Sequence, residues 1–188
     1  TALPGIPRIA AGDDLVAIIN VGLDRANIAL RDGDLLVLAQ KIVSKAEGAM
    51  VAVDPDDPLS HKPLVERESV RILRRRGELI ISETRHGFVC ANAGIDLSNV
   101  ERGQAALLPE DPDRSARRIR DGLRGRLGVE AAVIVSDTFG RPWRRGVTAC
   151  SARSTPVRSC LLAVRWASAT PLPPVRWPVP CSIARSAT

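Results

Sequence analysis

An aspartate and a threonine directly follow an apolar run late in the chain. Residues 133–135 read Val-Ile-Val, and Ser136 leads from them to Asp137 and Thr138. Carboxylate and hydroxyl oxygens are ligands that Mg²⁺ and Mn²⁺ prefer. The loop that follows adds guanidinium groups suited to phosphate or carboxylate oxygens, at Arg141, Arg144 and Arg145. The same residues could cap a turn and lie in solvent, and on spacing alone the two interpretations carry equal weight.

A second acidic residue follows a predicted hairpin. Residues 79–82 and 88–92 are short apolar runs separated by five polar or glycine residues, a spacing typical of two paired strands. The second run leads into a loop that contains Asp96 and Asn99. This loop supplies another carboxylate at the end of a strand.

A third polar segment follows the apolar run 35–39. We expect residues 40–48 to form a loop, which presents Lys41 and Lys45 together with a serine hydroxyl. Acids, lysines and arginines thus all lie on segments that follow predicted strands. Binding and catalytic residues are commonly carried on loops that a rigid scaffold positions. The pattern therefore predicts a single site with both metal-binding and anion-binding groups.

The elements that must position these loops can be predicted from periodicity and from capping residues. Apolar residues at helical spacing predict three helices, at 14–25 behind the caps Asp13 and Asp14, at 64–75, and at 111–127 with Gly128 as its end. Short apolar runs predict strands, at 35–39, 79–82, 88–92 and 131–135. The proline-bearing stretch 51–61 is expected to be a loop. Because strands and helices are mixed rather than strictly alternating, we expect an α+β fold, a mixed sheet with flanking helices.

Several longer segments, in this order, resemble one family. They are Gly5-Ile6-Pro7 with Gly12 to Leu15, Lys41 to Gly48, Arg85 to Asp96 with Ser98-Asn99-Val100, Leu107-Leu108-Pro109 with Asp111-Pro112-Asp113, and Ser136 to Gly146. Over about residues 3–148 the chain is similar to the coenzyme F420:L-glutamate ligases, also called F420 gamma-glutamyl ligases. Several long matches in consistent order are more specific than any one short motif.

The resemblance implies a reaction and a set of ligands. It implies a GTP-dependent ligase that adds L-glutamate to the carboxylate of the deazaflavin coenzyme F420 precursor through an acyl phosphate, with later glutamates γ-linked. It implies Mg²⁺ or Mn²⁺, with Asp96 and Asp137 sharing one ion and Thr138 approaching a second. It also implies a GTP site lined by Gly5, Ile6, Pro7, Arg8, Gln40, Lys41, Lys45 and Asn99. The family resemblance further suggests a homodimer, and it identifies no catalytic acid, base or nucleophile.

Several of these residues also have purely structural interpretations. Lysines are usually solvated, but Lys41 and Lys45 are two of only three in the chain, and this favours nucleotide contact. Asn99 could equally form a local side-chain turn. We expect His86 to be structural or exposed and Cys90 to be a small core residue. The arginines 74–76 are expected at the end of a helix, facing solvent.

The C-terminal segment differs sharply in composition. All 21 acidic residues lie at or before Asp137, and residues 149–188 contain five of the 27 basic residues and three of the four cysteines. This segment is rich in Ala, Arg, Pro and Ser and has no sustained period, so we expect the ligase-like domain to cover 1–148. Residues 149–188 are then a tail outside the family pattern, frameshifted or disordered, with a disulfide-bearing extension less favoured. The family's later glycine-rich nucleotide segment would fall in this region, so the resemblance implies impaired activity.

Two other functions remain open. The two acids alone would also suit a metal-dependent phosphohydrolase. The basic tail could bind nucleic acid, but its arginines are not interleaved with enough aromatic residues to favour this. The first 148 residues are almost neutral, with 22 basic against 21 acidic residues, so the pI of about 9.9 says little about the partners of the folded part. The chain has no signal peptide and no apolar segment near 18 residues, which predicts a cytoplasmic protein with no membrane partner.

Overall fold

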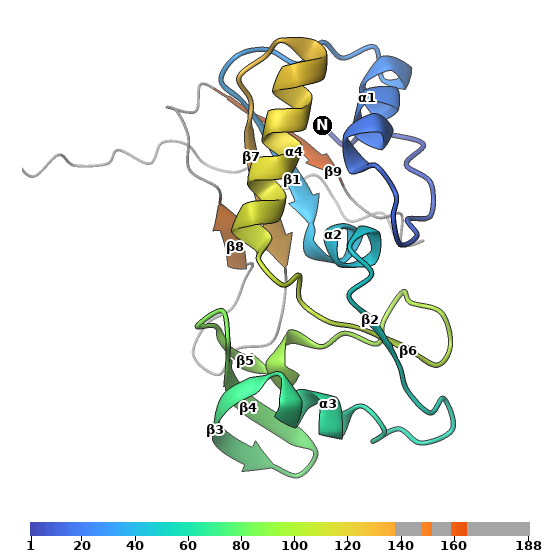
Figure 1. The fold of residues 1–188 in the computed structure, drawn as a ribbon, viewed down its shortest axis with the longest axis vertical. Helices are drawn as coiled ribbons and strands as arrows, with labels where there is room; N and C mark the ends of the chain where they lie inside the picture. The colour runs from blue at the N-terminus through green and yellow to red at the C-terminus, as the bar shows by residue number, and fades with distance from the viewer. Residues whose placement is uncertain (138–147, 152–158, 165–188) are drawn as a thin grey trace, which may run out of the picture.

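The computed structural model describes residues 1–137, 148–151 and 159–164, and side chains within residues 1–137. Its elements form two parts, one above the other in Figure 1. The upper part, here called the platform, contains residues 1–48, residues 111–137 and two short later strands. The lower part, here called the hairpin part, contains residues 50–106. Helices and mixed strands confirm the predicted α+β class.

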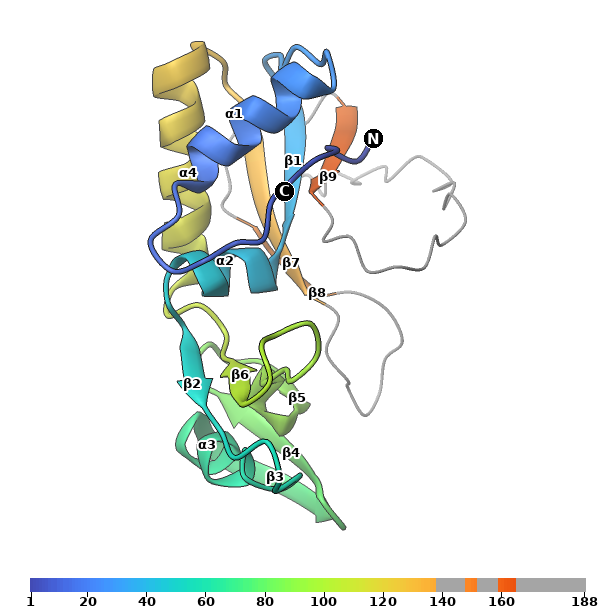
Figure 2. The same ribbon diagram turned by 90° about the vertical axis from the view of Figure 1, so that its right-hand side faces the viewer.

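The platform is a four-stranded sheet with helices against it. Strand β1 (Asp34–Ala39) lies between β7 (Ala132–Asp137) and β9 (Ser159–Val164), parallel to both, and β8 (Thr148–Ser151) pairs antiparallel with β7. Helix α4 (Pro112–Leu127) runs along the sheet, with α1 (Leu15–Arg25) beside it (Figure 2). Side chains from both helices and from β1 and β7 form one apolar cluster.

The ends of both long helices follow from local sequence. The Asp14 carboxylate caps α1 by accepting from the backbone N–H groups of Val16 (2.9 Å) and Ala17 (3.1 Å). Helix α4 begins after Asp111 and ends at Gly128, whose φ of 68° is the left-handed conformation that glycine adopts readily. The predicted helices at 14–25 and 111–127 and the strands at 35–39 and 131–135 are therefore confirmed.

The hairpin part is made of short antiparallel strands. Strands β3 (Ser69–Arg76), β4 (Leu79–Thr84) and β5 (Val89–Ala91) form one sheet, and β2 (Met50–Ala52) pairs with β6 (Gln104–Ala106). Helix α3 (Lys62–Arg67) and a short 3₁₀ turn, η1 (Asn92–Gly94), complete it. The predicted hairpin at 79–92 is confirmed, and Cys90 is fully buried as expected.

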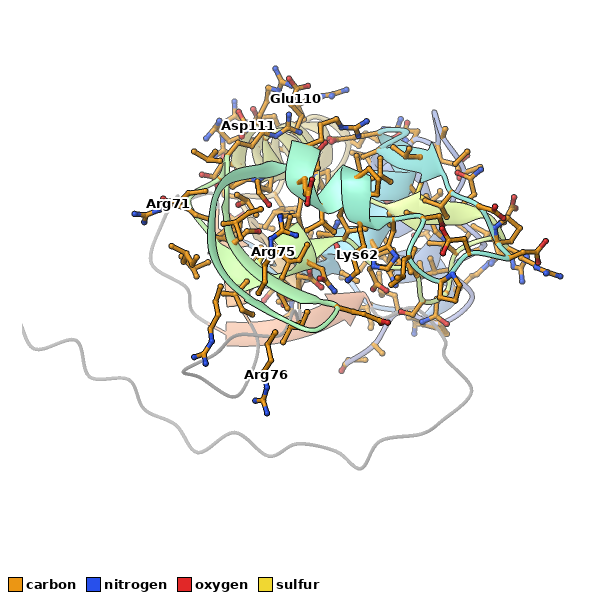
Figure 3. All side chains as sticks on the ribbon, turned by 90° about the horizontal axis from the view of Figure 1, so that it is seen from below. Lys62, Arg71, Arg75, Arg76, Glu110 and Asp111 are labelled. Carbon is orange, nitrogen blue, oxygen red and sulfur yellow. The ribbon has the colours of Figure 1, made fainter. Side chains whose placement is uncertain are left out.

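The predicted helix at 64–75 is confirmed only as far as Arg67 and is wrong beyond it. Helix α3 ends at Arg67, and residues 69–76 instead form β3, paired with β4. Of the apolar residues that suggested a helical face, Val65 is buried within α3, but Val70 and Leu73 are 70% and 42% exposed, so burial does not favour a helix beyond Arg67. Backbone pairing with β4 determines the conformation. The arginines 74–76 therefore lie on an exposed strand, and Figure 3 shows Arg76 pointing away from the molecule.

Two smaller predictions also need correction. Residues 40–48 are not a loop, because Gln40–Ala46 forms helix α2 directly after β1. No side chain caps its first turn, so the sequence lacked the usual start signal, and burial of Ile42 and Val43 stabilises the helix instead. The stretch 51–61 begins as a strand, since Val51 and Ala52 belong to β2. Strands β8 and β9 include residues of the segment 149–188, whose boundary with the ligase-like domain stays a prediction.

Candidate functional site

Helix α2 presents two lysines on one face. Lys41 and Lys45 are four residues apart, which puts them on adjacent turns of the same side. The other sides of α2 are buried, with Ile42 and Val43 in the main apolar cluster. Because α2 follows β1 without a linker, the position of both lysines is set by the carboxyl end of a central strand. Residues 40–48 were therefore predicted with the wrong conformation, a loop. The helix that forms instead aligns the two lysines.

The loop that contains Asp96 is fixed to the hairpin part by its backbone. Asp96 and Ala106 exchange two backbone hydrogen bonds, of 3.0 and 2.9 Å. The Asp96 carboxylate oxygen Oδ1 accepts from the backbone N–H of Ser98 (2.7 Å), which closes a tight turn. Asn99 follows in the left-handed conformation, with φ 54°. The loop thus turns back toward α2 after Asp96.

The lysines and this loop contact one another directly. Lys41 Nζ lies 2.5 Å from Asp96 Oδ2 and donates to the Ser98 carbonyl oxygen (2.5 Å) and to Ser98 Oγ (3.1 Å). Lys45 Nζ donates to the Asn99 carbonyl oxygen (2.9 Å). Residues 54 to 57 positions apart in the sequence therefore meet at one place. The structure brings together Lys41, Lys45, Asp96 and Asn99 from the predicted set.

The electrostatics of this cluster keep its carboxylate ionised. Burial alone would raise the pKa of Asp96, but hydrogen bonds from Lys41 and Ser98 outweigh it and lower that pKa below 3.8. The pKa of Lys45 is lowered from 10.5, first by burial and then by repulsion from Lys41 and Arg8. Arg8 is therefore close enough to add a third positive charge. Glu101 also acts on Lys45, with the opposite sign, so three cations face two carboxylates and the cluster keeps a net positive charge that suits phosphate oxygens.

The N-terminal segment contributes less directly. Gly5 has φ 68°, and its carbonyl oxygen accepts from Arg25 Nη1 (3.0 Å), which ties the segment to the end of α1. Ile6 packs against the main apolar cluster, and Pro7 is exposed. This segment leads to Arg8, the residue whose charge acts on Lys45. The nucleotide roles of Gly5, Ile6, Pro7 and Arg8 stay predictions.

Gln40 has a structural role in the fold. Its side chain is buried, and Nε2 donates to Ser44 Oγ (2.5 Å) and to the Leu107 carbonyl oxygen (3.0 Å). Ser44 Oγ donates to the same carbonyl (2.6 Å). These bonds attach α2 to the segment that follows β6 and leaves the hairpin part. A nucleotide contact from Gln40, which stays a prediction, would have to use its backbone or replace these bonds.

The second predicted metal ligand lies at the end of β7. Asp137 is half-buried and follows Ser136, which is in register with Ala39, the last residue before α2. Both strand ends therefore lie at the same edge of the sheet as the lysine helix. Thr138 and the arginines 141, 144 and 145 lie outside the described residues, so their predicted roles are untested. In the described part of the chain, no three His, Cys, Asp or Glu side chains gather as a metal site.

The donor chemistry at Asp96 nevertheless fits a divalent cation. Its carboxylate is ionised, partly buried and already in contact with a positive group, the Lys41 ammonium. Carboxylate oxygens are the ligands that Mg²⁺ and Mn²⁺ favour. Ser98 belongs to one of the matched segments but was not predicted as a site residue, although an aspartate such as Asp96 commonly bonds the backbone two positions later. Its backbone and hydroxyl oxygens hold Lys41.

Other features lie apart from this cluster. His86 Nε2 is bonded to the carbonyl oxygens of Pro109 (2.8 Å) and Glu110 (3.2 Å), which gives it the structural role expected. A cavity of about 820 Å³ lies on the far side of α2, between the starts of α1 and α4, and none of the predicted site residues lines it. Among the described helices, none is long and apolar enough to cross a bilayer.

The chain is similar to a known group of enzymes. A family model described as F420-0:Gamma-glutamyl ligase matches residues 5–159. Proteins named coenzyme F420:L-glutamate ligase align at 46% identity over 156 residues (Methanothermobacter thermautotrophicus), 42% over 166 (Methanopyrus kandleri) and 38% over 166 (Halorubrum lacusprofundi). These alignments cover 76%, 80% and 77% of this chain, but 62%, 64% and 61% of the relatives. The chain thus spans about six-tenths of the length of the curated relatives it matches.

Proposed function

The chain belongs to the F420-0:gamma-glutamyl ligase family, and on that premise we propose that it carries the GTP-binding and metal-binding part of a ligase. The substrates are L-glutamate and the glutamate-free precursor of coenzyme F420. The observation that carries the proposal is the meeting of Lys41 and Lys45 with the Asp96 loop. Two cations beside an ionised carboxylate match the needs of a metal-bound triphosphate.

The proposed reaction has two steps. A carboxylate oxygen of the precursor attacks the γ-phosphorus of GTP, and the bond between this phosphorus and the oxygen of the β-phosphate breaks. The precursor becomes an acyl phosphate, and GDP leaves. The amine of L-glutamate then attacks the acyl carbon and loses a proton. The bond from this carbon to the phosphate breaks, so inorganic phosphate leaves and the amide remains. Negative charge shifts between phosphate oxygens throughout, so fixed positive groups are the main catalytic requirement.

Each residue has a role that follows from its contacts. The ammonium groups of Lys41 and Lys45 bind and orient the phosphate oxygens, and Arg8 adds charge beside Lys45. Asp96 and Asp137 would hold Mg²⁺ or Mn²⁺, with Thr138 as a ligand of a second ion, and such ions supply charge neutralisation on the triphosphate. Asn99 accepts from Lys45 through its backbone carbonyl oxygen and would line the nucleotide site beside that lysine. Gly5, Ile6, Pro7 and Gln40 would line the remaining wall.

Nucleotide binding tests this proposal without requiring turnover. We expect Lys45→Gln to weaken Mg²⁺-GTP binding about tenfold or more by calorimetry, because a hydrogen bond to a charged group contributes roughly 1.5–3 kcal/mol. Lys62→Gln is the matched control, since Lys62 is the third lysine and lies on α3, where it binds the Glu78 carbonyl oxygen and Asn92. Equal loss in both variants, or no GTP binding at all, would remove the nucleotide site from α2.

Product formation distinguishes the ligase from the phosphohydrolase. The resemblance implies that the family's later glycine-rich segment carries an acidic or amide ligand, and residues 149–188 contain no Asp, Glu, Asn or Gln to supply it. We therefore expect this chain to bind GTP but to form little or no product from L-glutamate and the precursor. Steady GTP hydrolysis that needs neither acceptor would favour the phosphohydrolase instead.

A further inference from the structure

We propose that Lys41 is a positioning residue that holds the Asp96 carboxylate in place of a divalent cation, so that Lys41 and the cation compete for Asp96 until a bound phosphate engages Lys41. This inference rests on the metal and nucleotide roles proposed above. It concerns the order in which the divalent cation and the nucleotide bind and how each affects the affinity for the other, which those roles leave open. Lys41 would then make metal affinity depend on nucleotide.

The contacts of Asp96 place Lys41 at the oxygen that a cation would use. Oδ1 accepts the backbone N–H of Ser98 at 2.7 Å, and Oδ2 lies 2.5 Å from Lys41 Nζ. A Mg²⁺ ion binds carboxylate oxygens at about 2.0–2.1 Å. This distance is similar to the 2.5 Å between Lys41 Nζ and Asp96 Oδ2. A cation that took Oδ2 from the same side would meet the ammonium both sterically and by charge repulsion. A cation that approaches Oδ2 from the side of Lys41 therefore requires Lys41 to move.

The ammonium of Lys41 is well held where it is. An ammonium group has three donors, and Lys41 has three acceptors, Asp96 Oδ2, the Ser98 carbonyl oxygen and Ser98 Oγ. Its side chain is only 16% exposed, so water is a poor substitute for these partners. Displacing it without a new acceptor leaves a partly buried charge unsatisfied, which is costly.

A nucleotide phosphate would supply the missing acceptors. Phosphate oxygens near α2 can accept from Lys41, and Lys45 one turn further along would bind the same group. Once Lys41 points to phosphate, Asp96 Oδ2 is available to the cation. Binding of either ligand then favours the other, and thermodynamic linkage requires that this coupling be reciprocal.

The test measures Mn²⁺ affinity without nucleotide, by electron paramagnetic resonance of free Mn²⁺. We expect Lys41→Gln to bind Mn²⁺ at least about fivefold more tightly than the unsubstituted chain, at the lower end of typical coupling. We expect the gain in Mn²⁺ affinity caused by GDP to shrink by the same factor. Lys45→Gln is the matched control, because it removes one positive charge from the same helix face. The native Lys45 bonds to Asn99 rather than to Asp96.

The outcomes separate this inference from the proposed function. If Asp96→Asn abolishes Mn²⁺ binding but Lys41→Gln leaves it unchanged or weaker, the metal role stands and the competition is wrong. An equal gain in Mn²⁺ affinity in Lys41→Gln and Lys45→Gln would show that the loss of any nearby positive charge is sufficient, and it would also overturn the competition. If Asp96→Asn changes nothing, the metal role itself fails, and the competition fails with it. Ser98→Ala, which removes one acceptor of Lys41, should tighten Mn²⁺ binding to a smaller degree and serves if Lys41→Gln does not fold.

Discussion

The platform and the hairpin part are stabilised in different ways. Among the described side chains, sixteen apolar residues form the main buried cluster of the platform, whereas the separate cluster of the hairpin part has three, Val65, Ile80 and Ala93. The hairpin part relies more on polar contacts, such as Ser69 Oγ to Ser82 Oγ (2.7 Å) and the Arg71–Glu83 ion pair (2.9 Å). Figure 3 shows Arg71 on its outer edge, where ion pairs add little stability.

The site draws one component from each part. Lys41 and Lys45 come from a helix packed on the platform core, while Asp96, Ser98 and Asn99 come from a loop of the hairpin part. Buried apolar contacts hold the lysines in position, and hydrogen bonds hold the loop. We therefore expect the backbone of α2 to stay rigid, so that only the Lys41 side chain changes direction there, and the loop backbone to be the part that adjusts when a ligand binds.

The largest expected effect tests the difference between the two cores. Leu36 on β1 is fully buried, so Leu36→Ala should lower the free energy of unfolding by about 2–5 kcal/mol. Leu79→Ala on β4 is the control, because Leu79 is 42% exposed and its loss should cost less than about 1 kcal/mol. Urea denaturation followed by circular dichroism measures both. Similar losses would show that the platform core does not dominate stability.

An intermediate effect is expected at the junction with the Asp96 loop. Gly94 has φ 72°, and a Cβ there would lie 3.0 Å from Leu108 Cδ1. Gly94→Ala should therefore cost about 1–3 kcal/mol of strain and should weaken Mn²⁺ binding, since Asp96 is two residues away. Gly87→Ala is matched in backbone conformation, with φ 77°, but a Cβ there meets no atom within 4 Å.

Thermal denaturation and Mn²⁺ titration of both variants check this prediction. Gly87→Ala should lower the melting temperature less and leave Mn²⁺ affinity unaltered. If the two variants behave alike, contact with Leu108 does not shape the loop, and only the backbone conformation matters.

The smallest effect concerns the cap of α1 in the platform. Hydrogen bonds from Ala17, and then the charge of Arg126, lower the pKa of Asp14 below 3.8. A carboxyl whose pKa is lower in the folded state stabilises the fold above its unfolded pKa, and this contribution is lost as the pH falls through the folded pKa. Asp14→Ala should cost about 1 kcal/mol at neutral pH, and the difference from the unsubstituted chain should shrink below pH 3.8.

Asp14→Asn separates the cap from the charge. Asparagine keeps an acceptor for Val16 and Ala17 but loses the ion pair with Arg126, which is half exposed. We expect it to retain most of the stability at neutral pH and to show less pH dependence in acid. Stability curves in urea at several pH values measure this. A full loss in Asp14→Asn would assign the effect to charge instead.

Local signals predicted most of the platform. Asp14, Gly128 and the apolar runs of β1 and β7 act over a few residues, so they are visible without the fold. The same reasoning failed for residues 69–76 and 40–46. The conformation of residues 69–76 depends on pairing with β4, and that of residues 40–46 depends on burial against β1 and α4 rather than on a cap.

For the site, the sequence alone determined which residues have suitable chemistry and which family the chain resembles. Lys41, Lys45, Asp96 and Asn99 were identified from residue type and motif, and the structure brings them together. Only the tertiary structure decided that Lys41 binds Asp96, that Ser98 holds Lys41, and that Gln40 is engaged with Leu107. The reason is physical, because hydrogen bonds between residues more than fifty positions apart depend on how α2 and the hairpin part pack. Neighbouring residues in the sequence do not encode that packing.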